Sequence, residues 1–64
     1  MKSEYVYIYA LYKGQKKYKP MDLKTNQQVT NLVRATRIKR EEGDRFMRTD
    51  ALINEDWKFE LRDA

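Results

Sequence analysis

The chain has 64 residues and a net charge of +4, from 14 lysines and arginines against 10 acidic residues. One domain of this length has a core worth roughly 3–5 kcal/mol, which leaves no room for a substrate cavity as well. Cysteine and histidine are both absent, and with them disulfides, thiolate metal sites and the commonest catalytic bases. We therefore expect a non-enzymatic protein that uses no cofactor.

The charges divide the chain into a basic middle and an acidic tail. Residues 13–24 carry five lysines and one aspartate, and residues 31–48 carry five arginines, one lysine and three acids. Residues 49–64 carry two basic and five acidic residues. Such a middle segment favours an anionic partner, of which nucleic acid is the commonest large one. No apolar run could span a membrane and no signal peptide is recognisable, so we expect the cytoplasm of a bacterial host cell.

Two strands are expected at the start of the chain. Residues 4–13 (EYVYIYALYK) are rich in aromatic and β-branched residues, which predicts a strand. A turn at residues 13–16 then leads to a weaker second strand over residues 17–21. Pro20 limits that strand to a sheet edge or places Pro20 near the strand's own end, because proline cannot donate to a β-ladder.

A helix is expected to begin at Thr25. The segment Thr25-Asn26-Gln27-Gln28 has the form of a capping box. The next apolar and β-branched residues fall on one helical face: Val29, Leu32, Val33 and Thr36.

Two endings of this helix remain open. It can run to Gly43 as a C-cap, but Ile38 would then be exposed on the wrong side. The interpretation we favour breaks it near Arg37, with residues 38–48 forming a hairpin that turns at Glu42-Gly43-Asp44.

The tail returns to a strand pattern. Trp57, Phe59 and Leu61 alternate with charged residues, which is typical of a strand with one buried face. Residues 49–56 are expected to form a loop or a short helical turn. The expected core consists of the tail's three apolar residues together with Leu32, Val33, Leu52 and Ile53.

These elements predict an α+β fold in a single domain over residues 1–64. An antiparallel sheet of three to four strands would pack on one main helix, in the order β-β-α-(β-β)-β. A winged-helix-like arrangement is the alternative.

Glu41, Glu42 and Asp44 form an acidic cluster that could be read as a site for a hard metal ion. They lack the ligand spacing of a calcium loop and are flanked by arginines. We interpret them as a solvated turn and expect no metal site.

The basic segment is the main candidate for function. Asn31, Arg34 and Arg37 lie beside the apolar stripe of the expected helix, and asparagine and arginine make bidentate contacts to adenine and guanine. The expected hairpin supplies cations for phosphates: Lys39, Arg40, Arg45 and Arg48. Nucleic acid, and DNA before RNA, is therefore the favoured partner.

Residues 30–52, TNLVRATRIKREEGDRFMRTDAL, resemble the recognition helix and wing of phage excisionase-type winged-helix proteins. The resemblance implies that Asn31, Arg34 and Arg37 read DNA bases. It also implies that Arg40, Arg45 and Arg48 contact the DNA backbone. The role that it implies is that of a regulatory or accessory phage protein. The upstream residues depart from that family, because a tyrosine-rich strand replaces its first helix.

The first strand is the second candidate. Tyr5, Tyr7 and Tyr9 share one face, and Val6, Ile8 and Ala10 share the other. The interpretation we favour is a central strand with one face covered by the helix and the other partly exposed. The tyrosines could also stack on a single-stranded nucleic acid. In a third interpretation they bind a host protein, as an inhibitor or adaptor would, or a second copy in a homodimer.

Overall fold

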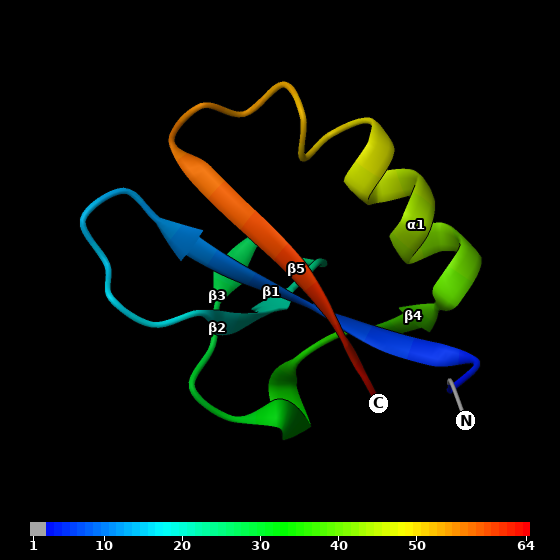
Figure 1. Cartoon of the computed structure of the whole chain (residues 1–64). Helices are drawn as coiled ribbons and strands as arrows, with labels where there is room; N and C mark the ends of the chain where they lie inside the picture. The colour runs from blue at the N-terminus through cyan, green and yellow to red at the C-terminus, as the bar shows by residue number, and fades with distance from the viewer. Residues whose placement is uncertain (1–2) are drawn as a thin grey trace.

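A computed structural model describes residues 3–64 of the chain and has the expected α+β class, an antiparallel sheet packed on one α-helix (Figure 1). The sheet has five strands, one more than the upper limit expected from the sequence. In chain order the elements are β1 (Tyr5–Tyr12), β2 (Lys19–Asp22), β3 (Gln27–Gln28), the 3-10 helix η1 (Leu32–Arg34), β4 (Arg37–Lys39), α1 (Arg40–Arg48) and β5 (Trp57–Asp63).

Strand β1 is the centre of the sheet. One edge of β1 pairs with the whole length of β5, from Tyr12 opposite Trp57 to Val6 opposite Asp63. The other edge pairs with β4 through residues 5–7 and with β2 through residues 9–10. Strand β3 extends the sheet beyond β2. The aromatic and β-branched composition that predicts β1 thus belongs to the strand with most partners.

Helix α1 covers one face of β1 and β5. The buried residues of β1 on this face are Val6, Ile8 and Ala10. Gly43 is the buried residue of α1, and its missing side chain brings the helix close to Val6. One turn further along α1, the ring of Phe46 packs edge-on against Phe59 of β5, with 4.9 Å between ring centroids. The predicted central strand, covered on one side, is therefore confirmed.

The prediction of a helix that begins at Thr25 is wrong. Residues 23–26 turn the chain between β2 and β3, with Asn26 at a φ of +56°. Asparagine tolerates this left-handed conformation better than most residues. The Asp22 carboxylate accepts a hydrogen bond from the Lys24 amide at 2.9 Å, a local turn that competes with helix formation. The apparent capping box lies in this hairpin.

The prediction of a hairpin over residues 38–48 is also wrong, because residues 40–48 form α1. Strand β4 ends at Lys39, and the following sequence REEGDRFMR consists mostly of good helix formers. Glu41 and Glu42 lie in its first turn and Arg45 and Arg48 in its last, as the helix dipole favours. Gly43 is therefore a helix-interior residue and neither a turn nor a C-cap.

The sequence located part of the core correctly. The tail strand is confirmed, and Trp57, Phe59 and Leu61 are partly buried against the core. Leu32 and Val33 were expected to be buried but are 45% and 87% exposed. Their placement is wrong because the helix that was to bury them does not form.

Leu52 and Ile53 are 75% and 82% exposed in the turns between α1 and β5, so their predicted burial is wrong as well. The loop expected over residues 49–56 is itself confirmed.

The predicted turn at residues 13–16 and the second strand are confirmed, although β2 runs from Lys19 to Asp22. Gly14 has a φ of +92°, where glycine is favoured. Pro20 is the second residue of β2, near the strand's own end. Within residues 3–64, neither α1 nor η1 is long and apolar enough to cross a membrane.

Candidate functional site

The candidate site is the surface of the sheet opposite α1, which we call the tyrosine face. Strand β1 contributes the alternate residues that point away from the helix, namely Tyr5, Tyr7, Tyr9 and Leu11. The strands on either side of β1 contribute the residues paired with them: Arg37 and Lys39 of β4, and Lys58, Glu60 and Arg62 of β5. The row of aromatic rings therefore has charged side chains of β5 along one side and those of β4 beside Tyr5 and Tyr7 on the other, where Pro20 of β2 is the neighbour of Tyr9.

Two arginines lie over tyrosine rings on this face. The Arg37 guanidinium carbon is 5.0 Å from the ring centroid of Tyr5, and that of Arg62 is 4.1 Å from the ring centroid of Tyr9. Both distances fall within the range of a cation–π interaction. These guanidinium groups therefore help to orient the rings and place positive charge directly over them.

Glu60 lies opposite Tyr9 and holds Arg62 in place. An Arg62 guanidinium nitrogen, Nη2, donates to Glu60 Oε1 at 2.6 Å, and Nε donates to the same oxygen at 3.1 Å. The hydrogen bond to Glu60 raises the pKa of Arg62 above its already high value. Arg62 therefore stays charged at every pH at which the protein folds.

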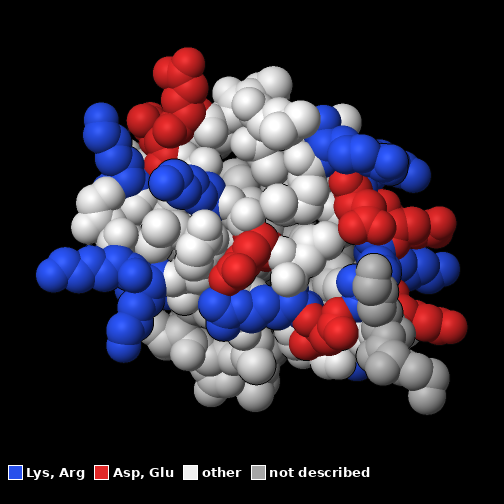
Figure 2. Space-filling view, in the orientation of Figure 1, with Lys and Arg blue, Asp and Glu red and all other residues white. Residues whose placement is uncertain are grey.

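The tyrosine face is more positive than the outer surface of α1. Strands β4 and β5 bring four basic side chains and one acidic side chain, Glu60, to this face. Helix α1 carries three arginines and three acidic residues, and Figure 2 shows blue and red side chains alternating on the right, where α1 lies in Figure 1. A second group of blue side chains lies on the left, over the lysine-rich turn between β1 and β2. The charge balance of α1 makes it a poor phosphate-binding surface.

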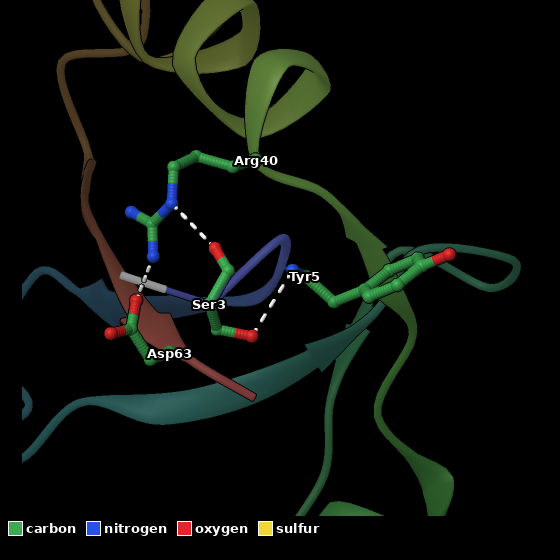
Figure 3. A network of polar contacts seen from close by, with 4 residues as sticks. All are labelled: Ser3, Tyr5, Arg40 and Asp63. Carbon is green, nitrogen blue, oxygen red and sulfur yellow. Dashed lines mark hydrogen bonds and ion pairs between the residues drawn. The ribbon is translucent and has the colours of Figure 1, made fainter. Parts of the chain in front are cut away.

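Arg40 is engaged in contacts within the protein. Its Nε donates to the carbonyl oxygen of Ser3 at 2.7 Å, and its Nη2 forms an ion pair with Asp63 (Figure 3). The Ser3 hydroxyl in turn accepts from the Tyr5 amide at 3.2 Å. The Arg40 side chain is 26% exposed. Arg40 therefore ties the start of α1 to the residue before β1 and to the end of β5, which lie at the same end of the sheet.

This cluster predicts a specific acid sensitivity. The hydrogen bond from Arg40 lowers the pKa of Asp63 below its ordinary value of 3.8. The ion pair therefore stabilises the fold above pH 3.8, and its contribution is lost as the pH falls from there through the lower, folded pKa. We expect Asp63→Asn to be less stable than the wild type at neutral pH. The difference should shrink to nothing in stronger acid, as measured by urea unfolding followed through Trp57 fluorescence.

Asp50→Asn is the matched control, because Asp50 is an exposed carboxylate beyond the end of α1. Its stability should follow the wild type across the same pH range. An Asp63→Asn protein as stable as the wild type at neutral pH would show that the ion pair contributes nothing to stability.

The structure distributes the predicted nucleic-acid residues over three elements, namely η1 with its cap, β4 and α1. Arg37 and Lys39 lie on the tyrosine face beside Tyr5, Tyr7 and Tyr9. Asn31 and Arg34 belong to η1, where the Asn31 side chain caps the helix by accepting from the Val33 amide at 2.9 Å. Arg40, Arg45 and Arg48 lie on α1, against the opposite face of the sheet. The helix and hairpin that were expected to carry these residues do not form, although Arg34 and Arg37 still line one shallow hollow beside β4.

Sequence reasoning missed Lys58 and Arg62. Their signal was available, because residues that alternate with Trp57, Phe59 and Leu61 must face away from the core. Antiparallel pairing with β1 then places them beside the tyrosines. The acidic cluster of Glu41, Glu42 and Asp44 was expected to be a solvated turn. These residues are exposed, as expected, but they lie on helix α1.

Comparison with known proteins yields no relative: no protein-family profile, curated protein or solved structure matches the chain. The resemblance of residues 30–52 to excisionase-type proteins stays a prediction. The helix and wing that it implied are replaced in this structure by η1, β4 and α1.

Proposed function

We propose that the protein is a non-enzymatic accessory protein that binds single-stranded nucleic acid on the tyrosine face. The observation that carries this proposal is the row of three tyrosines flanked by four cations of β4 and β5, with Arg37 and Arg62 already over tyrosine rings. Proteins that bind single strands combine aromatic rings, on which bases stack, with basic side chains that follow the phosphates. The tyrosine face supplies both on one side of a sheet.

The geometry favours single strands over a duplex. Reading the major groove requires a helix or a two-stranded ribbon that projects into it. Helix α1 presents balanced charges, and its Arg40 is bound to Ser3 and Asp63. The tyrosine face instead offers ring surfaces, which stack only on bases that are not already paired and stacked inside a duplex.

Binding should be tested with fluorescently labelled oligonucleotides followed by fluorescence anisotropy. We expect single-stranded DNA or RNA to bind more tightly than the matching duplex. Neutralising three to four phosphates should give a slope of log K against log salt of roughly −2 to −3 for a single strand. No binding at low salt, or a preference for the duplex, would sink the proposal.

Substitutions should locate the interface. Tyr5→Ala and Tyr9→Ala should each weaken single-strand binding by about 1–3 kcal/mol, because each removes a ring that can stack on a base. Tyr9→Phe should retain most of the affinity, because the ring remains. Arg45→Ala and Arg48→Ala are the matched controls on α1 and should change the affinity much less than Arg37→Ala does. Equal losses from α1 and the tyrosine face would place the interface elsewhere.

A host protein is the second candidate for the same face. Tyrosine and arginine dominate the energetic centres of protein interfaces, and Tyr5 is 39% exposed. Strand β1 is paired on both edges, so such a partner would cover the tyrosine face and could not add a strand to β1. In that case Tyr5→Ala would abolish capture of the partner while the wild-type protein bound no oligonucleotide.

A further inference from the structure

Strand β5 has one open edge. It pairs with β1 along its whole length, and among residues 3–64 no strand pairs with its other side. In Figure 1, β5 crosses in front of β1, and no described helix or strand lies in front of it. Seven residues make it the longest strand in the sheet with a free edge. An edge of this kind is a template for another strand.

The backbone groups that face outward can be identified from the two ends of the ladder. The Lys13 amide donates to the Asp56 carbonyl at 2.8 Å, and the Ala64 amide donates to the Tyr5 carbonyl at 3.0 Å. Hydrogen-bonded pairs alternate along an antiparallel ladder, so the even-numbered residues of β5 bond to β1. The amides and carbonyls of Trp57, Phe59 and Leu61 therefore point away from β1, toward the open edge.

The charges on β5 fit a second copy of the same strand in one register. When two β5 strands run antiparallel with Phe59 opposite Phe59, Lys58 of each protomer lies opposite Glu60 of the other. Trp57 then lies opposite Leu61, so the outward amides and carbonyls of all three residues meet partners. Opposite charges directly across an antiparallel pair are stabilising. The same register thus pairs the outward backbone groups in hydrogen bonds and places side chains of opposite charge against each other.

The neighbouring registers are unfavourable. A shift that places Glu60 opposite Glu60 also places Lys58 opposite Arg62, so like charges face each other in every charged pair. A further shift of the same size places Leu61 opposite Leu61 and Glu60 opposite Arg62, but it leaves the apolar ring of Phe59 facing the carboxylate of Asp63. The charges therefore exclude the register centred on Glu60, and the mismatch between Phe59 and Asp63 disfavours the one centred on Leu61, which leaves the register centred on Phe59.

We propose that the protein forms a symmetric dimer through β5, in which two copies join their sheets edge to edge around Phe59. This interface shares Lys58 and Glu60 with the tyrosine face but uses the open backbone edge of β5, and it does not require nucleic acid. Lys58, Glu60 and Arg62 point to the same side as the tyrosines, so the dimer would join two tyrosine faces into one longer surface. The sequence suggested a homodimer through the tyrosines of β1, whereas the dimer proposed here forms through β5, the neighbouring strand.

Charge reversal tests the register. The wild type should be a dimer by light scattering coupled to size-exclusion chromatography, in nuclease-treated protein free of nucleic acid. Lys58→Glu should be monomeric, because the new carboxylate at position 58 would face Glu60 of the other copy. The double variant with Lys58→Glu and Glu60→Lys should recover the dimer, because opposite charges again face each other. Arg45→Glu is the control with the same change in net charge, and it should remain dimeric.

A monomeric wild type at the highest soluble concentration would overturn the proposal. A Lys58→Glu protein that remains dimeric, or a double variant that remains monomeric, would overturn it as well. Circular dichroism of each variant separates loss of the dimer from loss of the fold.

Cysteine pairs give a second test, which the absence of native cysteine makes simple. Residues 58 and 60 of opposite copies would form a pair without backbone hydrogen bonds, with Cα atoms about 4.5 Å apart, within reach of a disulfide. The variant with Lys58→Cys and Glu60→Cys should form a covalent dimer on mild oxidation. The variant with Lys58→Cys and Arg62→Cys should stay monomeric on a non-reducing gel. The opposite pattern would show that a different register forms, and no cross-link in either variant would exclude a dimer centred on Phe59; either result would overturn the proposal.

Discussion

Replacing Ile8 by alanine should leave the protein largely unfolded at room temperature. Ile8 is 1% exposed at the centre of β1. Removing such a side chain costs about 2–5 kcal/mol, from lost burial and from the cavity that remains. A domain of this size has a total stability of roughly 3–5 kcal/mol. Thermal unfolding followed by circular dichroism should therefore show little or no cooperative transition.

Leu11→Ala is the control, because Leu11 belongs to the same strand but faces the other side and is only partly buried. We expect it to retain a cooperative transition at a moderately lower temperature. An Ile8→Ala protein that melts like the wild type would show that the space between β1 and α1 is not the main core.

The strands were predictable because their signal is local. In β1 buried residues alternate with more exposed ones, and in β5 apolar residues alternate with charged ones. This period of two identifies which side chains share a face. Val6, Ile8 and Ala10 are accordingly buried, and Trp57, Phe59 and Leu61 pack against them. Such alternation depends on no other part of the chain.

The helix was misplaced because two local signals pointed to the wrong segment. Thr25 and Gln28 have the spacing of a capping box, but Asn26 adopts the left-handed conformation of a hairpin turn. Helix α1 begins after Lys39 without a side-chain cap. Its interior contains Gly43, which local rules interpret as a helix end or a turn. Only the tertiary contact between Gly43 and the sheet explains a glycine at that position.

The site was predictable in part. Arg37 and Lys39 were selected for the wrong element, and they reach the tyrosines because β4 pairs with β1. Lys58 and Arg62 reach the same face through β5, although they lie near the opposite end of the chain from the tyrosines. Strand order and pairing are long-range properties, and a single sequence does not encode them in any local pattern.

Gly43 provides the second large prediction. A Cβ atom at this position would lie 2.8 Å from Val6 Cγ2, and 3.1 and 3.2 Å from the two methyl groups of Leu61. Alanine gains about 1 kcal/mol over glycine in a helix interior, but here it must push α1 away from the sheet. We expect Gly43→Leu to cost about 1–3 kcal/mol or more, because a larger side chain overpacks the same space.

A double-mutant cycle with Val6 separates the clash from any other effect of the substitution. Val6→Ala removes Cγ2, the atom nearest to the new side chain, so Gly43→Ala should be less destabilising in the Val6→Ala background than in the wild type. Urea unfolding measures the four free energies, and Glu42→Ala, at an exposed position of α1, serves as the control. If Gly43→Ala instead stabilises the wild type by its full helix propensity, α1 does not pack against β1 as closely as its glycine indicates.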